Sequence, residues 1–169
     1  CSRVQEAPRD KRVTVAGVVT TVREKTLKDA QRMAFVGLEA LTGLYQVWPD
    51  PLLRTRVLEM LEICRDRIYS EPGYLVQFLS ADWKPTLNPD SFGHDVETGF
   101  LMVEAAMTLG LEDPRVSTAA RRLVDHAMQY GWDRERGGLY DAGTLNTEGA
   151  VIGGLRTEKV WWVQAEHLN

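Results

Sequence analysis

Two helix-start signals constrain most strongly what this chain can fold into. Asp50-Pro51 and Asp113-Pro114 each join an N-capping aspartate to a proline at the first helical position, where the missing proline N–H costs nothing. Apolar residues then recur every three or four positions, as on an amphipathic helix. The predicted core positions are Leu53, Val57, Leu58, Met60, Leu61, Cys64 and Ile68, then Val116, Ala119, Ala120, Leu123, Val124, Ala127 and Met128. The charged positions of the first helix, Arg54, Arg56, Glu59, Glu62, Arg65 and Asp66, are expected to face solvent.

The same periodicity predicts further helices. One covers 38–48 and ends at Pro49, and another follows the N-cap Ser91 and stops at Gly110. A last helix begins near Lys159, and Pro72-Gly73 marks a turn within a short hairpin. Helix pairs separated by short hairpins usually stack into a solenoid or close into a ring, because one pair cannot bury both of its faces.

The first residues follow a different pattern. Val13, Val15, Val18, Val19 and Val22 predict a strand, bent at Gly17. The sequence therefore predicts a β-rich extension over 1–37 and a mainly α-helical domain over 38–169.

Composition narrows the range of functions. The 169 residues carry a formal net charge of -4 and a mean hydropathy of -0.27, which disfavours a general nucleic-acid or membrane surface. Cys1 and Cys64 are not expected to form a disulfide, and this fits a reducing, cytoplasmic location.

The segment 91–97 concentrates reactive side chains at a helix start. His94 and Glu97 are three residues apart and therefore share a helix face. A carboxylate beside a histidine orients the ring and raises its proton affinity, so the pair is a candidate acid/base site. Acidic residues at a helix start also suit the helix dipole, so a capping and salt-bridge cluster is the alternative interpretation.

A second candidate site lies near the C-terminus. Adjacent indoles at Trp161 and Trp162, with Gln164 and Glu166, suit a sugar, because indoles stack on pyranose faces while amides and carboxylates bind hydroxyls. The tryptophans could equally be core anchors between helices. We expect His126, within the helix that follows Pro114, to be a partly buried packing residue.

Four segments in this order, 38–53, 91–97, 137–140 and 159–166, resemble the N-acylglucosamine 2-epimerase and cellobiose 2-epimerase family. The resemblance implies a partial (α/α)6 barrel that holds a sugar. It implies epimerisation at C2 of an aldose or N-acylhexosamine through an enediolate, with no metal or redox cofactor. His94 would be one of two catalytic histidines and Glu97 its carboxylate neighbour. Trp162 and Glu166 would line the sugar site, with Trp161, Gln164 and Asp95 as further substrate contacts.

The resemblance also implies a second catalytic histidine beyond Asn169. We therefore expect this chain to be a fragment that is inactive or weakly active by itself. Helix faces left uncovered in such a fragment are expected to promote self-association.

A second resemblance concerns residues 12–43. This stretch is similar to the opening strands of the OB-fold of bacterial replicative DNA polymerase alpha subunits. It implies an alternative function, a single-stranded nucleic-acid-binding module fused to a helical remnant, in which Lys25, Lys28 and Arg32 contact phosphate.

Overall fold

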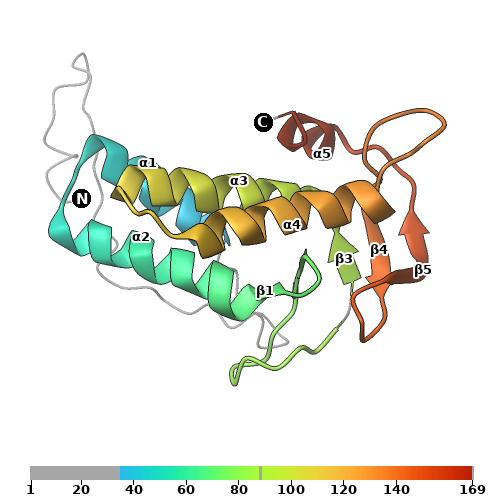
Figure 1. Ribbon diagram of the computed structural model, residues 1–169, viewed down its shortest axis with the longest axis horizontal. Helices are drawn as coiled ribbons and strands as arrows, with labels where there is room; N and C mark the ends of the chain where they lie inside the picture. The colour runs from blue at the N-terminus through green and yellow to red at the C-terminus, as the bar shows by residue number, and fades with distance from the viewer. Residues whose placement is uncertain (1–34, 88, 169) are drawn as a thin grey trace, which may run out of the picture.

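A computed structural model describes residues 35–87 and 89–168 (Figure 1). The described part is mainly helical, as predicted. The predicted extension over 1–37 lies outside the described residues except for 35–37, where the first helix begins. The helices of the described part are α1 (Phe35–Val47), α2 (Pro51–Ile63), α3 (Phe92–Leu109), α4 (Pro114–Tyr130) and α5 (Trp161–Glu166). Helix α2 continues as the π-helical segment Cys64–Ile68.

The four long helices alternate in direction and form two antiparallel hairpins side by side (Figure 1). The short connections 48–50 and 110–113 lie at one end of this layer. All the strands and α5 lie at the other end, where α3 begins and α4 finishes. This alternation confirms the prediction of helix pairs separated by short strands.

The predicted helix ends are confirmed by their capping geometry. The Asp50 carboxylate accepts the N–H of Leu52 at 2.8 Å, and Asp113 accepts the N–H of Arg115 at 3.0 Å. Gly110 ends α3 in the left-handed conformation with φ 66°, which glycine adopts without steric cost. Helix α1 begins at Phe35, ahead of the predicted start at Leu38.

Two small antiparallel sheets complete the strand end. Strands β1 (Tyr69–Ser70) and β2 (Tyr74–Leu75) form a hairpin around the predicted Pro72-Gly73 turn. Strands β3 (Pro89–Ser91), β4 (Ala142–Leu145) and β5 (Val151–Arg156) form a sheet in the order β3-β4-β5. Because Asp90 pairs with Gly143 and Ser91 with Ala142, this sheet fixes the chain directly before α3.

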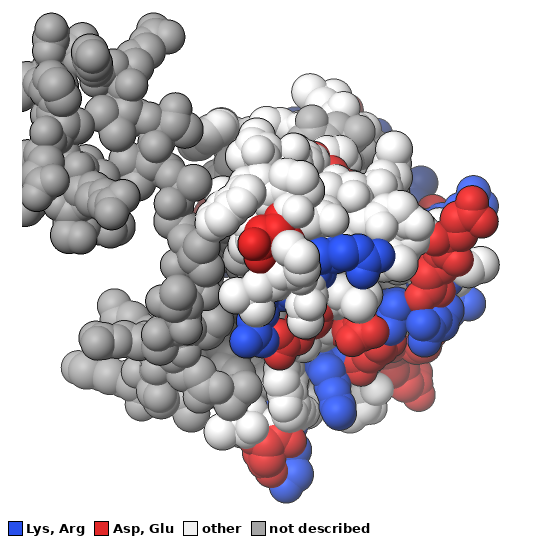
Figure 2. Space-filling model, turned by 90° about the vertical axis from the view of Figure 1, so that its left-hand side faces the viewer, with Lys and Arg blue, Asp and Glu red and all other residues white. Residues whose placement is uncertain are grey.

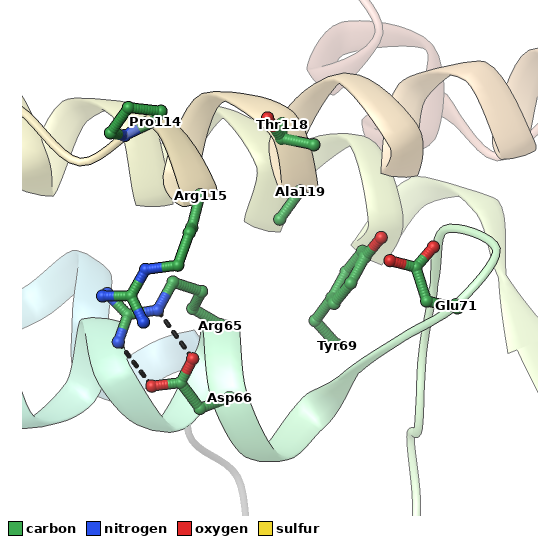
Figure 3. Close-up of a pocket in the computed structure, with 8 residues that line it drawn as sticks. All are labelled: Arg65, Asp66, Tyr69, Glu71, Pro114, Arg115, Thr118 and Ala119. Carbon is green, nitrogen blue, oxygen red and sulfur yellow. Dashed lines mark hydrogen bonds and ion pairs between the residues drawn. The ribbon is translucent and has the colours of Figure 1, made fainter.

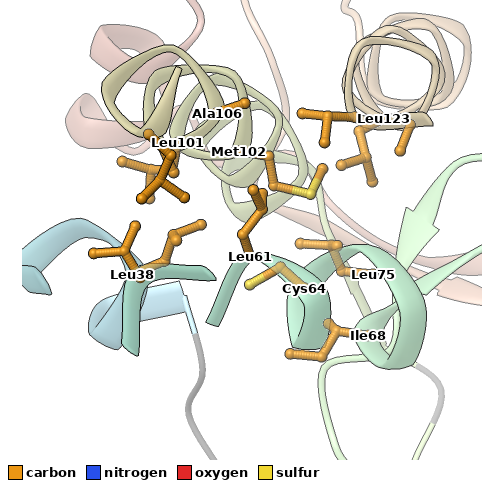
Figure 4. Packing of buried hydrophobic residues seen from close by; sticks show 14 of the residues in the cluster. Leu38, Leu61, Cys64, Ile68, Leu75, Leu101, Met102, Ala106 and Leu123 are labelled. Atoms are coloured by element: carbon orange, nitrogen blue, oxygen red, sulfur yellow. The ribbon is translucent and has the colours of Figure 1, made fainter. Parts of the chain in front are cut away.

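Apolar side chains fill the space between the α1–α2 hairpin and the α3–α4 hairpin (Figure 4). The main cluster joins α1, α2, α3 and α4 through fully buried Leu38, Leu61, Met102 and Leu123. A second cluster, Phe92, Val96, Ala127, Leu139 and Val163, lies under the start of α3 and α5. Burying each such large side chain stabilises the fold by roughly 1.5–3 kcal/mol. The candidate segments 91–97 and 159–166 therefore pack against a well-filled core.

Two predicted orientations are wrong. Arg65, expected in solvent, is only 9% exposed, because its guanidinium reaches Asp66 and Asp113 across the gap to α4. Val124, expected in the core, is 38% exposed. The Arg65 position shows how a charged residue is buried when a partner on another helix satisfies it.

The end of the molecule that carries the short helix connections has mixed charge (Figure 2). Acidic and basic side chains are interspersed there among uncharged ones, without separation into a basic surface. Within the described residues, no helix is both long and apolar enough to cross a membrane.

Candidate active site

Helix α3 carries both predicted catalytic residues in its first turns. Ser91 is the N-cap with an extended backbone, although its side chain makes no capping hydrogen bond. Phe92, fully buried, anchors the helix start in the second core cluster. His94 and Glu97 are partly buried and share a helix face, as their spacing predicts.

His94 packs against Trp162 of α5. The centroids of the two rings are 5.0 Å apart and their planes are inclined by 38°, which is a close aromatic contact. The approach of α5 to α3 depends on Gly93. A Cβ atom at this position would lie 2.6 Å from Cη2 of Trp162 and 2.7 Å from Cγ2 of Val163. Glycine at position 93 therefore allows α5 to pack closely against the start of α3.

The environment of His94 favours the neutral imidazole. Burial lowers the pKa of His94 below its usual value, and the negative charge of Asp141 opposes this shift in part. A neutral imidazole can accept a proton from a substrate. His94 thus has the protonation state that a general base needs.

Glu97 lies among other carboxylates. Burial, together with the negative charges of Glu166 and Glu39, raises the pKa of Glu97 to about 7. These three residues belong to α3, α5 and α1, so three helices bring their carboxylates to one surface. A carboxyl group with a pKa near 7 is available as donor and acceptor at neutral pH.

Helix α5 is held in place by the turn that precedes β4. Lys159 donates to the Asp133 carboxylate at 2.6 Å and also to the carbonyl of Gly137. The Gln164 amide accepts the N–H of Leu139 at 2.9 Å and donates to the Leu139 carbonyl at 2.8 Å. These bonds fix Trp162 against His94.

The structure brings together some of the predicted site residues and separates others. His94, Glu97, Trp162 and Glu166 lie on one surface, which we call the His94 surface. The Gln164 amide braces the Leu139 backbone, and Trp161 is 80% exposed. Asp95 is completely buried and accepts the N–H of Leu75 at 3.1 Å. Lys25, Lys28 and Arg32, predicted to contact nucleic acid, lie outside the described residues.

The sequence did not predict two residues that change pKa values on the His94 surface, Glu39 for Glu97 and Asp141 for His94. Glu39 stands in the segment 38–53, where the sequence indicated only an amphipathic helix. Asp141 stands beside Tyr140 at the start of β4. No local pattern predicts that either residue approaches α3. Glu39 comes near α3 through the packing of α1, and Asp141 through the pairing of β4 with β3, which directly precedes α3.

A separate pocket of about 330 Å³ lies between α4 and the segment that runs from the π-helical residues into the β1–β2 hairpin (Figure 3). Its wall includes Arg65 and Arg115, which both pair with Asp113 at 2.7 Å, and Arg65 also pairs with Asp66. The arginine charges are thus already compensated within the protein. This pocket lies at the ion-pair network that ties α2 to α4 and contains none of the residues of the His94 surface.

Helix hairpins with short strands at one end, where His94 meets Trp162, define a mainly helical class of protein. Comparison with known sequences gives the family. The profile of the N-acylglucosamine 2-epimerase (GlcNAc 2-epimerase) family matches residues 10–169, so the chain belongs to that family.

Curated relatives support this assignment. The chain is 27% identical over 132 residues to the cellobiose 2-epimerase of Bacteroides fragilis, covering 76% of this chain and 32% of the relative. It is 30% identical over 131 residues to the cellobiose 2-epimerase of Ruminococcus albus, again covering 76% and 32%. The chain thus spans about a third of the length of these relatives.

Solved structures show the same fold. Cellobiose 2-epimerase from Bacillus thermoamylovorans superposes with a TM-score of 0.70 at 24% identity, covering 79% of this chain and 32% of that one. A sugar epimerase from a ruminal bacterium gives a TM-score of 0.64 at 26% identity, covering 79% and 33%. The described helices therefore correspond to part of an (α/α)6 barrel.

The OB-fold resemblance of residues 12–43 is not supported. The family match covers residues 10–169, which include that stretch. The valine-rich pattern that suggested opening barrel strands is short, and such local patterns recur in unrelated folds.

Proposed function

We propose that the His94 surface performs proton transfer at C2 of an aldose, as one part of a sugar 2-epimerase site. The observation that carries the proposal is the contact between His94 and Trp162 beside Glu97 and Glu166. It places a neutral base next to an aromatic face and hydrogen-bonding carboxylates. The family assignment supplies the class of substrate, a sugar.

The chemistry follows from these groups. In the open-chain aldose, His94 takes the proton from C2 and the electrons of the C–H bond move into the C1 carbonyl, which gives an enediolate. Trp162 stacks on an apolar sugar face, while Glu97 and Glu166 orient hydroxyl groups. Return of a proton to the opposite face of C2 needs a second acid, for which we propose a side chain from another part of the complete barrel.

The names of the curated relatives favour a β-linked glucose disaccharide over an N-acylhexosamine. Cellobiose is the sugar named for these relatives. We propose cellobiose as the first substrate to test, with N-acetylglucosamine as the comparison.

Two measurements on this chain test the proposal. Titration with cellobiose is expected to shift the NMR signals of the Trp162 indole and His94 ring. In heavy water, the chain is expected to exchange the C2 hydrogen of the sugar for deuterium only slowly. The reason is that part of a barrel positions the sugar and excludes water less well than a complete one.

His94→Gln should abolish this exchange with the fold retained. His167→Gln is the matched control, because His167 packs on Trp132 and is also partly buried, and it should exchange as the unsubstituted chain does. Exchange that survives in His94→Gln would exclude His94 as the base, and signals of Trp162 and His94 that do not shift with cellobiose would exclude the sugar site.

A further inference from the structure

A buried cluster with unusual charge lies behind α3, away from the His94 surface. It consists of Asp90 on β3, Asp95 on α3 and His126 on α4, and we call it the buried triad. Both aspartates have no exposed surface and His126 is 4% exposed. The His126 Nδ1 atom lies 3.5 Å from Oδ2 of Asp90 and 3.8 Å from Oδ2 of Asp95.

The tautomer of His126 follows from its other nitrogen. Nε2 lies 2.7 Å from the carbonyl oxygen of Gly149. A carbonyl oxygen only accepts, so Nε2 must carry the hydrogen and donate it. In the neutral ring, the Nδ1 lone pair then faces the two carboxylates, an arrangement that is repulsive unless a proton or a metal ion lies between them.

The atoms that face the centre of the triad are poorly satisfied. Asp90 Oδ1 and Oδ2, Asp95 Oδ2 and His126 Nδ1 are all buried without a well-formed hydrogen bond. The Asp90 carboxyl lies close to that of Asp95, and burial followed by the charge of Asp90 raises the pKa of Asp95. The distances of 3.5 and 3.8 Å from Nδ1 are too long for good hydrogen bonds. Unpaired buried carboxylates are costly, and proteins pair them or use them to coordinate metals.

We propose that the buried triad binds one divalent metal ion of the Zn²⁺ type, which ties β3, α3 and α4 together. One imidazole and two carboxylates are a ligand set that Zn²⁺ accepts. The ligand atoms all lie within 4.8 Å of one another. Zinc bonds of about 2.0–2.2 Å in a tetrahedron separate neighbouring ligand atoms by roughly 3.3 Å, close to the spacing found here.

Charge and orientation also fit a divalent ion. Two carboxylates and a neutral imidazole carry two negative charges, which the ion cancels inside the protein. The Nε2–H bond to the Gly149 carbonyl is the outer contact that orients metal-bound histidines. This inference does not depend on the proposed function, since the triad lies apart from the His94 surface.

The experiment measures metal content and thermal unfolding of the chain. Protein freed of metal with a chelator is refolded with or without Zn²⁺, and unbound ion is removed by gel filtration. We expect one Zn²⁺ per chain and a raised melting temperature, because an ion that binds only the folded state stabilises it. X-ray absorption of the zinc protein should show nitrogen and oxygen ligands, including an imidazole, and no sulfur.

Asp90→Asn is the sharpest variant. It removes one buried negative charge at nearly constant shape, so the metal-free protein should be at least as stable as before, while the Zn²⁺-induced rise in melting temperature should disappear. His167→Gln is the matched control, and it should bind one Zn²⁺ as the unsubstituted chain does. A Cys1→Ser background removes the thiol at the chain start. Burial raises the pKa of the Cys64 thiol to about 12, which keeps that thiol protonated.

Three outcomes would overturn the metal site. The first is a chain that retains no Zn²⁺ and gains no thermal stability, which would mean that protons alone neutralise the triad. The second is equal Zn²⁺ binding by Asp90→Asn, and the third is a sulfur ligand in the absorption spectrum. The second and third outcomes would show that Zn²⁺ binds outside the buried triad. The absorption measurement needs no variant, so it decides the question even if Asp90→Asn does not fold.

Discussion

At Gly93, a single missing methyl group permits the contact on which the site depends. Gly93→Ala would push a Cβ atom into Trp162 and Val163 at less than 3 Å, and α5 would have to move. We expect a loss of about 1–3 kcal/mol in the free energy of unfolding. The cellobiose-induced shift of the Trp162 indole signal should be lost as well. Chemical denaturation and NMR titration measure the two effects.

Gly43→Ala provides the matched control. Gly43 is an exposed position inside α1 with nothing within 4 Å of a built Cβ atom. Alanine is the better helix former there, so this variant should gain about 0.5–1 kcal/mol. If Gly93→Ala is as stable as Gly43→Ala, α5 does not pack on α3 as described.

The residue scale also shows what local reasoning can and cannot reach. His94 and Glu97 share a face because they are three positions apart, and the sequence predicted this. His94 and Asp95 are consecutive, and consecutive residues on a helix point in directions about 100° apart. Asp95 therefore points into the core, where it meets Asp90 and His126. Recognising the buried triad from sequence would have required knowing that β3, α3 and α4 meet there.

At the scale of elements, the turn before β4 and the start of α5 are joined by one ion pair. Lys159, together with the backbone N–H groups of Arg136 and Glu135, lowers the pKa of Asp133 to about 2. The Asp133 side chain is only 9% exposed. This pair therefore contributes to holding α5 and Trp162 in position.

The lowered pKa gives a defined pH dependence. The unfolded chain takes up a proton on Asp133 near its usual value of 3.8, while the folded chain does so only near about 2. Stability from this group is present above about pH 4 and is lost as the pH falls towards 2. The difference in unfolding free energy between the unsubstituted chain and Asp133→Asn should shrink across that window.

A double-mutant cycle with Lys159→Met is the control for this prediction. In the Lys159→Met background, Asp133→Asn should cost less stability at neutral pH than it does with Lys159 present. Equal costs in both backgrounds would mean that the ion pair does not stabilise the docking of α5.

Element boundaries were more predictable than element pairing. Aspartate caps, prolines at first helical positions and Gly110 act within a few residues, so the starts of α2 and α4 and the end of α3 were correct. The order β3-β4-β5 joins residues about fifty positions apart, and no local signal specifies it. The same reason explains Arg65, whose partner Asp113 stands on the next helix hairpin.

At the scale of the whole molecule, the described helices form only part of a ring. The matched share of the relatives is about a third, and large apolar side chains are left exposed. Val47 is 80% exposed and Met107 is 76% exposed. The ends of α1 and α3 lie side by side, because the Gln46 amide donates to both Glu104 and Thr108. Exposed apolar surface of this kind favours association.

We expect the chain to self-associate through this end of the helix layer. Sedimentation velocity should show a mass that rises with protein concentration, and the double variant Val47→Glu, Met107→Glu should reduce the association strongly. Val124→Glu, on the exposed side of α4, is the control and should associate as the unsubstituted chain does, since Val124 is only 38% exposed. A chain that stays monomeric at every concentration, or a double variant that associates unchanged, would show that copies do not meet through α1 and α3. An unchanged helical signal in circular dichroism would confirm that the added charges altered the surface and not the fold.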